Sequence, residues 1–367
     1  MTTTLMKASH QWSTRPADER FVSLDDMGAH FEERRSQSRE LVIPAKALTV
    51  RPDEDNVGLE VVGPQGSGYA PTHWSFGQLT SIANIPGIQA QGLRNLPSPL
   101  AADVINYGIR FKREVEDVGV LLHRNGASTM PAITGPNYGR VWNSEIVAVL
   151  RKHFGNGRDG VWKVPGEFGK DVTITKENTT LFAGDRDLFV FLADEKNRIE
   201  IPNRRNGQHG LLARGFFVWN SEVGAKSFGL GTFLFDYVCC NRIVWGAEGY
   251  SEIRIRHTSS APDRFIEEVQ PALLTYQQNS TIGITNAIEV AQKAKIEKDV
   301  AEFLAERFGS QGRAKAMLAT HELEEGRPIE TLWDAATAAT AYARSMTHQD
   351  ERVKIEREAG KLLKLAA

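Results

Sequence analysis

The sequence has only two cysteines, and these are the neighbours Cys239 and Cys240. Adjacent cysteines close a strained ring at best, so the disulfide framework of a small secreted domain is excluded. No histidines stand at metal-ligand spacing from this pair, which excludes a zinc site built on the two thiols. Because the pair lies in an apolar stretch, it is typical of buried structural thiols in a reducing cytosol.

Long apolar runs and an excess of one charge are also missing. No run approaches membrane-spanning length, and the opening residues MTTTLMKASHQWSTRPADER lack the apolar centre of a signal peptide. The 44 basic and 46 acidic residues leave a net charge of −2, so a nucleic-acid surface can only be a local patch. We therefore expect a cytoplasmic protein with no membrane partner.

Catalytic and cofactor-binding signatures are absent as well. The sequence has no P-loop, no Gly-x-Gly-x-x-Gly after a strand, no His-Glu-x-x-His and no nucleophile elbow. The glycines of SFGLGTF, at 227–233, have no lysine or hydroxyl residue in register, and this pattern is typical of close packing. The sequence thus predicts no catalytic site, no metal site and no cofactor.

The pattern of apolar residues predicts an α+β fold, with a mixed or antiparallel sheet followed by an all-helical C-terminal region. We expect an arm over 1–40, an α+β core over 41–260 and helices over 261–367. Strands are predicted within 41–62, at 118–122 and 130–134 around an RNGAS turn, and within 160–193. Helices are predicted at 73–85, 99–111 and 145–154, together with a buried helix at 228–241.

The string VWNSE occurs twice, at 141–145 and 218–222. Each copy follows an RNG turn and precedes a second Val-Trp pair, which predicts two structurally similar halves. In each half a strand with a largely buried tryptophan, Trp142 or Trp219, would lead into a helix capped by the Asn or Ser. The alternative is that Glu145 and Glu222 are paired carboxylates of one site.

Residues 196–261 combine basic and aromatic side chains. They hold nine Lys/Arg against five Asp/Glu, interleaved with Phe216, Phe217, Trp219, Tyr237 and Trp245. Arginines at alternate strand positions, as in RIRH, point from one face of a sheet, where they can contact phosphates while aromatic rings stack on bases. The alternative is a solvated strand face over core aromatics. The predicted nucleic-acid contacts are Arg204, Arg205, Arg214, Trp219, Lys226, Arg242, Arg254, Arg256 and His257.

Four strings carry a resemblance to a known family: HQWSTRPADERFVSL, TGPNYGRVWNSEI, FVWNSEVGAKSFGLGTFLFDYVCCNRIVWG and IRIRHT. Together they resemble the phage- and plasmid-like proteins built on the domain of unknown function 932, from about residue 10 to about 300. The family's Cys-x-Asn pattern is matched by Cys239 and Asn241, and its Arg-His-Thr by residues 256–258. The resemblance implies that the protein is encoded on a phage, a plasmid or an integrated element of a bacterium. It does not imply a particular reaction or cofactor.

These observations favour a non-catalytic protein that binds or anneals single-stranded DNA in the bacterial cytoplasm, self-associating through its C-terminal helices. DNA and RNA are not distinguished. One alternative is an enzyme acting on nucleic acid or nucleotide, and another is a host-directed anti-defence inhibitor. The candidate acid/base or metal-binding groups of such an enzyme are Glu145, Glu222, Asp236, His209 and His257.

Overall fold

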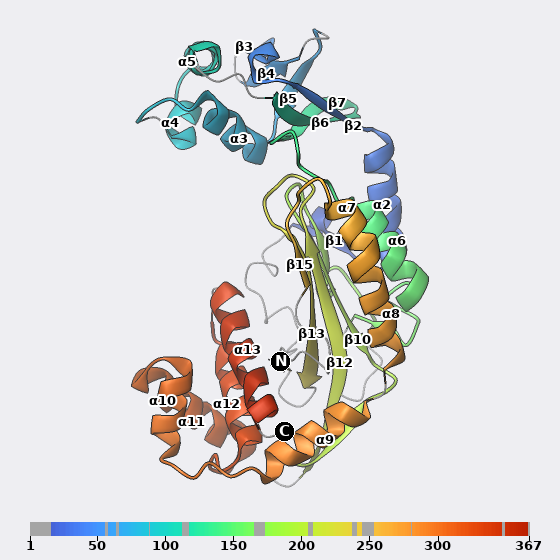
Figure 1. Cartoon of the computed structure of the whole chain (residues 1–367), viewed down its shortest axis with the longest axis vertical. Coiled ribbons are helices and arrows are strands. Elements are labelled where there is room, and N and C mark those ends of the chain that lie inside the picture. Colours follow the sequence, from blue (N-terminus) through green and yellow to red (C-terminus); the bar gives the residue numbers. More distant parts are fainter. Residues whose placement is uncertain are drawn as a thin grey trace.

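The fold places two β-sheets one after the other along the molecule's longest axis, and the C-terminal helices lie beside and below the lower part of the second sheet (Figure 1). It was obtained as a computed structural model, which describes residues 16–55, 58–63, 66–87, 89–111, 117–164, 173–204, 208–236, 241–243, 253–279, 281–346 and 349–365.

The body at the top of Figure 1 is a six-stranded sheet with helices on one face. Its order is β2-β6-β7-β5-β4-β3, and β5 pairs with β7 in parallel. The predicted hairpin around the RNG turn is confirmed, because Val120 pairs with Ile133. Phe76, Leu79 and Ile105 pack the helices onto the sheet. The strands are β2 (Ser38–Pro44), β3 (Thr49–Pro52), β4 (Leu59–Val62), β5 (Gly68–Pro71), β6 (Asp117–Asn125) and β7 (Ala127–Thr134), and the helices are α3 (His73–Ala83), α4 (Ala90–Arg94) and α5 (Ser98–Phe111).

The central sheet has nine strands, and its pairings are antiparallel. The main path is β1-β9-β10-β12-β13-β14, with β8 on β10, β11 on β12 and β15 on β13. Its members are β1 (Arg20–Phe21), β8 (Trp162–Lys163), β9 (Leu181–Ala183), β10 (Leu188–Asp194), β11 (Ile199–Arg204), β12 (Gln208–Asn220), β13 (Phe228–Asp236), β14 (Asn241–Ile243) and β15 (Ile253–Ile255).

Helices cover one face of this sheet and aromatic rings lie on the other. The covering helices are α2 (Leu24–Ser36), α6 (Asn143–Phe154), α7 (Ala261–Arg264) and α8 (Gln270–Gln278). Their apolar side chains share one core with Val190, Phe216 and Val218. The helix α2, which falls in the predicted N-terminal arm, therefore packs on this chain's own sheet. The opposite face carries the aromatic cluster Phe182, Phe189, Phe191, Phe217, Trp219, Phe233 and Phe235.

The predicted buried helix at 228–241 is wrong, because residues 228–236 form strand β13. Every residue of β13 is buried, so both faces are apolar and the alternation that marks a half-exposed strand disappears. Gly229 and Gly231 also suit the strand, since the rings of Trp219 and Phe217 lie over them on the neighbouring β12. Residues 237–240, with both cysteines, lie outside the described residues.

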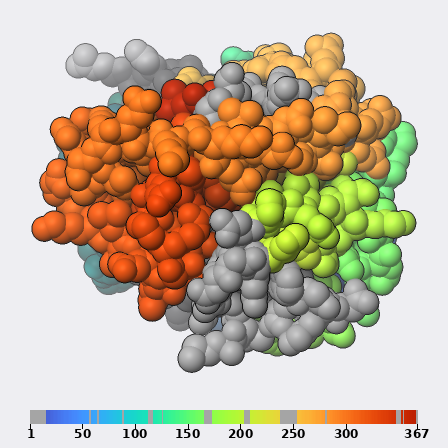
Figure 2. All heavy atoms as spheres, turned by 90° about the horizontal axis from the view of Figure 1, so that it is seen from below, coloured from blue at the N-terminus to red at the C-terminus, as the bar shows by residue number. Residues whose placement is uncertain are grey.

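The C-terminal region is helical, as predicted. After α7 and α8 it continues with α9 (Ile282–Lys293), α10 (Val300–Phe308), α11 (Gln311–Glu325), α12 (Leu332–Ala343) and α13 (Gln349–Leu365). Its core, built around Trp333 and Ile288, includes Ile201 and Leu212 of the central sheet. Seen from below, these orange and red helices lie directly against the yellow-green strands (Figure 2). None of the described helices combines the length and apolar character needed to cross a membrane.

The predicted nucleic-acid contact Arg214 is instead a buried part of the scaffold. Its Nε donates to Asp194 Oδ2 at 3.2 Å, and the two side chains are 6% and 0% exposed. The guanidinium also donates to the carbonyls of residues 276, 277 and 279 at the C-terminal end of α8. These carbonyls have no partner within the helix, so Arg214 both caps α8 and joins it to the sheet. Its assignment to a ligand surface is therefore wrong.

Arg214→Met should lower the free energy of unfolding by about 3–5 kcal/mol, because it leaves Asp194 buried without its cation. Urea unfolding followed by circular dichroism measures this loss. Arg264→Met is the matched control, since Arg264 pairs with Glu268 on the exposed side of the helix layer. Equal losses in the two variants would contradict the structural role of Arg214.

Candidate nucleic-acid interface

The two VWNSE copies have different local structures, so the predicted internal repeat is wrong. The first copy opens helix α6 at Asn143, whereas the second ends strand β12 at Asn220 and enters the loop 221–227. Trp142 and Trp219 are both partly buried, but Trp142 precedes helix α6 and Trp219 lies within strand β12, so their positions are not related as predicted. The predicted caps are also wrong. Neither Ser144 nor Asn143 caps α6, and the element that follows the second copy is strand β13, not a helix.

The two copies contact each other. Glu222 of the second copy accepts a hydrogen bond from the backbone N–H of Asn143 at 2.7 Å, and so it caps α6 from outside the helix. Asn220 donates to Val141 O and to Asn143 Oδ1, both at 2.8 Å. The alternative of paired catalytic carboxylates is not supported, because Glu145 faces outward to Arg35.

Residues of the six-stranded body also hold the loop 221–227 in place. Val223 O accepts hydrogen bonds from Trp74 Nε1 at 2.9 Å and Gln78 Nε2 at 2.8 Å, both on α3. Tyr138 OH donates to Ser221 O at 2.7 Å. Ser221 Oγ reaches the β9–β10 turn by donating to the carbonyl of Arg186 at 2.6 Å. The loop is therefore fixed on three sides by separate parts of the chain.

Trp219 lies flat on the central sheet beside this loop. In the strand registers, Phe189, Trp219, Gly229 and Arg254 are consecutive neighbours across β10, β12, β13 and β15. A Cβ at Gly229 would lie 1.9 Å from the indole, so the ring sits directly over this glycine. The Arg254 guanidinium carbon is 5.8 Å from the centre of the Trp219 ring. The sheet thus presents a partly exposed ring with a cation next to it.

Further exposed cations lie at the same end of the sheet. Lys226 is in the loop 221–227, Arg256 directly follows β15, and Arg186 is in the β9–β10 turn. Lys226 is 3.1 Å from Asp187, and Arg186 is 3.7 Å from Asp185. We call Trp219, Arg186, Lys226, Arg254 and Arg256 the Trp219 corner. Arg186 was missed in the sequence because it precedes the basic segment by ten residues, and only the sheet register brings it close.

The remaining predicted contacts besides Arg214 are Arg204, Arg205, Arg242 and His257. Arg205 lies outside the described residues, and for Arg204 and Arg242 only the backbone is described. The ring of His257 stacks on Tyr138 with centroids 4.9 Å apart, and its Nδ1 is 3.0 Å from Gly139 O. Burial lowers the pKa of His257 and its Nε2 is inaccessible, so this residue does not serve as a phosphate contact at the surface.

The candidate acid/base groups do not form one site, although Glu222 and His257 both lie near Tyr138 and Arg140. Glu222 is buried as a helix cap, while Glu145 is at the surface. Asp236 and His209 lie at the other end of β12 and β13, roughly 30 Å and 40 Å from Glu222 along the strands. Within the described ranges, no group of three or more His, Cys, Asp or Glu side chains could hold a metal ion. These residues therefore do not support the enzyme hypothesis.

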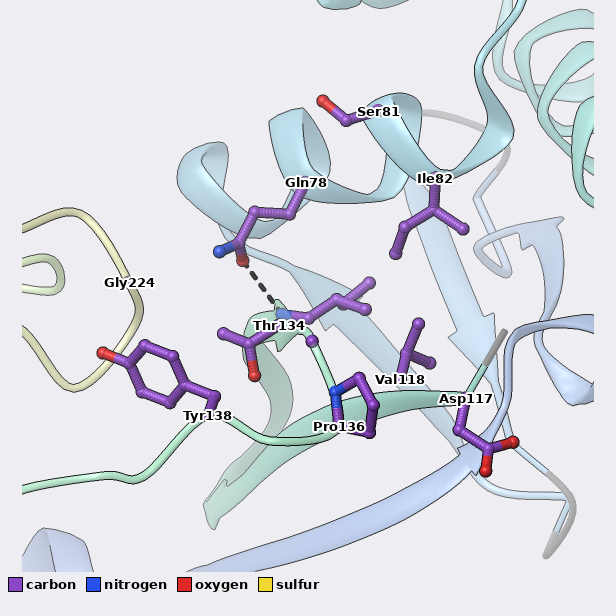
Figure 3. A pocket seen from close by; sticks show the side chains of 11 residues that line it. Gln78, Ser81, Ile82, Asp117, Val118, Thr134, Pro136, Tyr138 and Gly224 are labelled. Atoms are coloured by element: carbon purple, nitrogen blue, oxygen red, sulfur yellow. Dashed lines mark hydrogen bonds between the residues drawn. The ribbon is translucent and has the colours of Figure 1, made fainter. Parts of the chain in front are cut away.

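A cleft of about 620 Å³ lies between the six-stranded body and the loop 221–227 (Figure 3). Its walls are α3, β6, β7, the segment 135–138 and Gly224 of the loop. The walls are largely apolar, with Ile82, Val118 and Pro136 between Asp117 at one end and Tyr138 at the other. Gln78 holds one wall in place, because its Oε1 accepts from the N–H of Ile133 at 2.9 Å. This volume is sufficient for a small organic ligand.

The family model described as "Domain of unknown function (DUF932)" matches residues 168–361, which is just over half of the chain. The matched region begins after α6 and includes both the loop 221–227 and the helical C-terminal region. No curated protein and no solved structure matches the chain.

Glu222→Gln should change how the stability of the protein depends on pH. Burial raises the pKa of the Glu222 carboxyl, with nearby Arg34 and the Asn143 N–H acting in the opposite direction. The folded chain therefore binds this proton more tightly than the unfolded chain. The resulting stabilisation is complete below about pH 4.5, the ordinary pKa of this carboxyl, and is lost as the pH rises through the folded pKa.

Urea unfolding at several pH values measures this effect as the unfolding free energy of the wild type minus that of Glu222→Gln. The difference should decrease as the pH rises. Glu145→Gln controls for the loss of one carboxylate at the start of α6. A difference that stays constant or increases with pH would contradict the burial of a titrating Glu222.

Proposed function

The chain belongs to the family built on the domain of unknown function 932, and we propose that it binds single-stranded nucleic acid at the Trp219 corner. The observation that carries the proposal is the partly exposed Trp219 ring, flat on Gly229 with the Arg254 guanidinium beside it. An aromatic face stacks on a base, and neighbouring cations neutralise the adjoining phosphates.

A single strand fits this corner better than a duplex. Stacking on Trp219 needs an unpaired base, and the described elements of the corner are turns and strand ends, which offer no helix to enter a groove. The four exposed cations, Arg186, Lys226, Arg254 and Arg256, belong to three separate segments of the chain. They can therefore follow a bent backbone around the ring. DNA and RNA remain alternatives for the test.

The proposed setting is a phage, plasmid or integrated element in the bacterial cytoplasm. There the protein would hold or anneal single strands, and it would do so as a homo-oligomer assembled through α9–α13. An annealing function requires no catalytic group, which agrees with the scattered positions of Glu145, Asp236 and His209. A host-directed inhibitor remains the alternative, and it requires no affinity for nucleic acid.

Anisotropy titration of a labelled oligo-dT over a salt series tests the proposal. With up to four cations engaged, log K should fall against log salt with a slope of about −2 to −3. Trp219→Ala should weaken binding by about 1–3 kcal/mol, the usual contribution of a stacked base. Arg254→Ala should reduce the steepness of the slope by about 0.7.

The matched controls are Tyr107→Ala and Arg110→Ala, which remove an exposed ring and an exposed cation from α5 in the other body. They should bind like the wild type. No binding at low salt, or equal losses in the corner and control variants, would refute the proposal. Oligo-U in place of oligo-dT tests RNA in the same way, and light scattering on the same samples measures self-association.

A further inference from the structure

We infer that the cleft between the six-stranded body and the loop 221–227 selects a base of the bound strand, favouring bases with an exocyclic amino group over thymine or uracil. This inference rests on the proposed function, because it treats the cleft as an extension of the Trp219 corner. The two share one loop, in which Gly224 lines the cleft and Lys226 belongs to the corner two residues later.

The cleft is large enough to hold one base. Its volume of about 620 Å³ lies in the range of small-ligand pockets. Ile82, Val118 and Pro136 supply apolar surface, and the Tyr138 ring stands at the end nearest Gly224 (Figure 3). Tyr138 is fixed there, since its hydroxyl donates to Ser221 O and its ring stacks on His257. A base could therefore enter the cleft without displacing Tyr138.

Gly224 keeps the end of the cleft beside Tyr138 open (Figure 3). Its φ of +83° is in the left-handed region, where other residues are strained. A Cβ at this position would contact Gln78, Thr134 and Tyr138 at 3.4–3.6 Å, so any larger side chain would project into the cleft. The loop backbone thus comes close to the cleft without filling it.

Among the described residues that line the cleft, Asp117 is the charged one. It is the first residue of β6, it is exposed, and it makes no ion pair with any residue in the described part of the chain. A carboxylate only accepts hydrogen bonds, and it accepts from the amino group of cytosine or another amino-bearing base. Thymine and uracil offer a single N–H flanked by two carbonyl oxygens, which a carboxylate repels. Asp117 therefore gives the cleft a basis for discrimination.

Paired titrations with oligo-dC and oligo-dT of equal length, at mildly alkaline pH, test the inference. The two pyrimidines have similar stacking surfaces, so their affinity ratio reports on the base edge. The wild type should prefer oligo-dC by about five- to tenfold, at the low end of the discrimination given by a good base contact. Asp117→Ala should bring this ratio close to one.

Asp103→Ala is the matched control, because Asp103 is an exposed carboxylate of the same body that does not line the cleft. It should retain the wild-type ratio, although it removes the same charge. Equal wild-type affinities for the two oligonucleotides, or an unchanged ratio in Asp117→Ala, would overturn the base selection while leaving the proposed function intact. No binding of either strand at low salt would refute both.

Discussion

The hydrogen bonds between the two VWNSE strings are the constraint on which the rest of the structure depends. Asn143 donates its backbone N–H to Glu222, and Asn220 donates to Val141 O and Asn143 Oδ1. Asn220 and Glu222 are buried, where an unmade hydrogen bond is costly, so the start of α6 and the end of β12 must meet. This contact fixes the loop 221–227, and the loop in turn borders both the Trp219 corner and the cleft.

Two groups of described basic residues differ in what surrounds them. Arg214 and Arg140 are buried, each paired with a carboxylate and each within 6 Å of two aromatic rings. They join parts of the fold. Arg186, Lys226 and Arg256 lie at the surface around Trp219. A basic, aromatic segment of sequence thus contains both scaffold and surface residues, and only the second group can contact a ligand.

Patterns within short stretches of sequence predicted the elements whose formation depends on neighbouring residues in the chain. The helices at 73–83 and 143–154 follow from amphipathic spacing, and the hairpin at 117–134 follows from its RNG turn. Strand β13 was missed because burial on both faces removes the alternation. The VWNSE repeat was misinterpreted because its two copies contact each other. A five-residue string does not indicate which other segment it will contact.

The candidate site was predictable in part. Trp219, Lys226, Arg254 and Arg256 were predicted from the basic segment, whereas Arg186 and Asp117 reach the loop through tertiary contacts that no sequence spacing indicates. The same spacing could not separate buried Arg214 from exposed Arg254, since both lie in strands with aromatic neighbours. Exposure is decided by which helix covers which face, and this information is carried by distant parts of the chain.

The central claim is that the Trp219 corner is the surface that contacts a single strand. Ultraviolet crosslinking to a bromodeoxyuridine-containing single strand, followed by tryptic mapping, tests it most directly. The proposal predicts crosslinks in the peptide 215–226, which contains Trp219. Crosslinks confined to the helices beyond α8 or to the six-stranded body away from the cleft, or no crosslink at all, would contradict it.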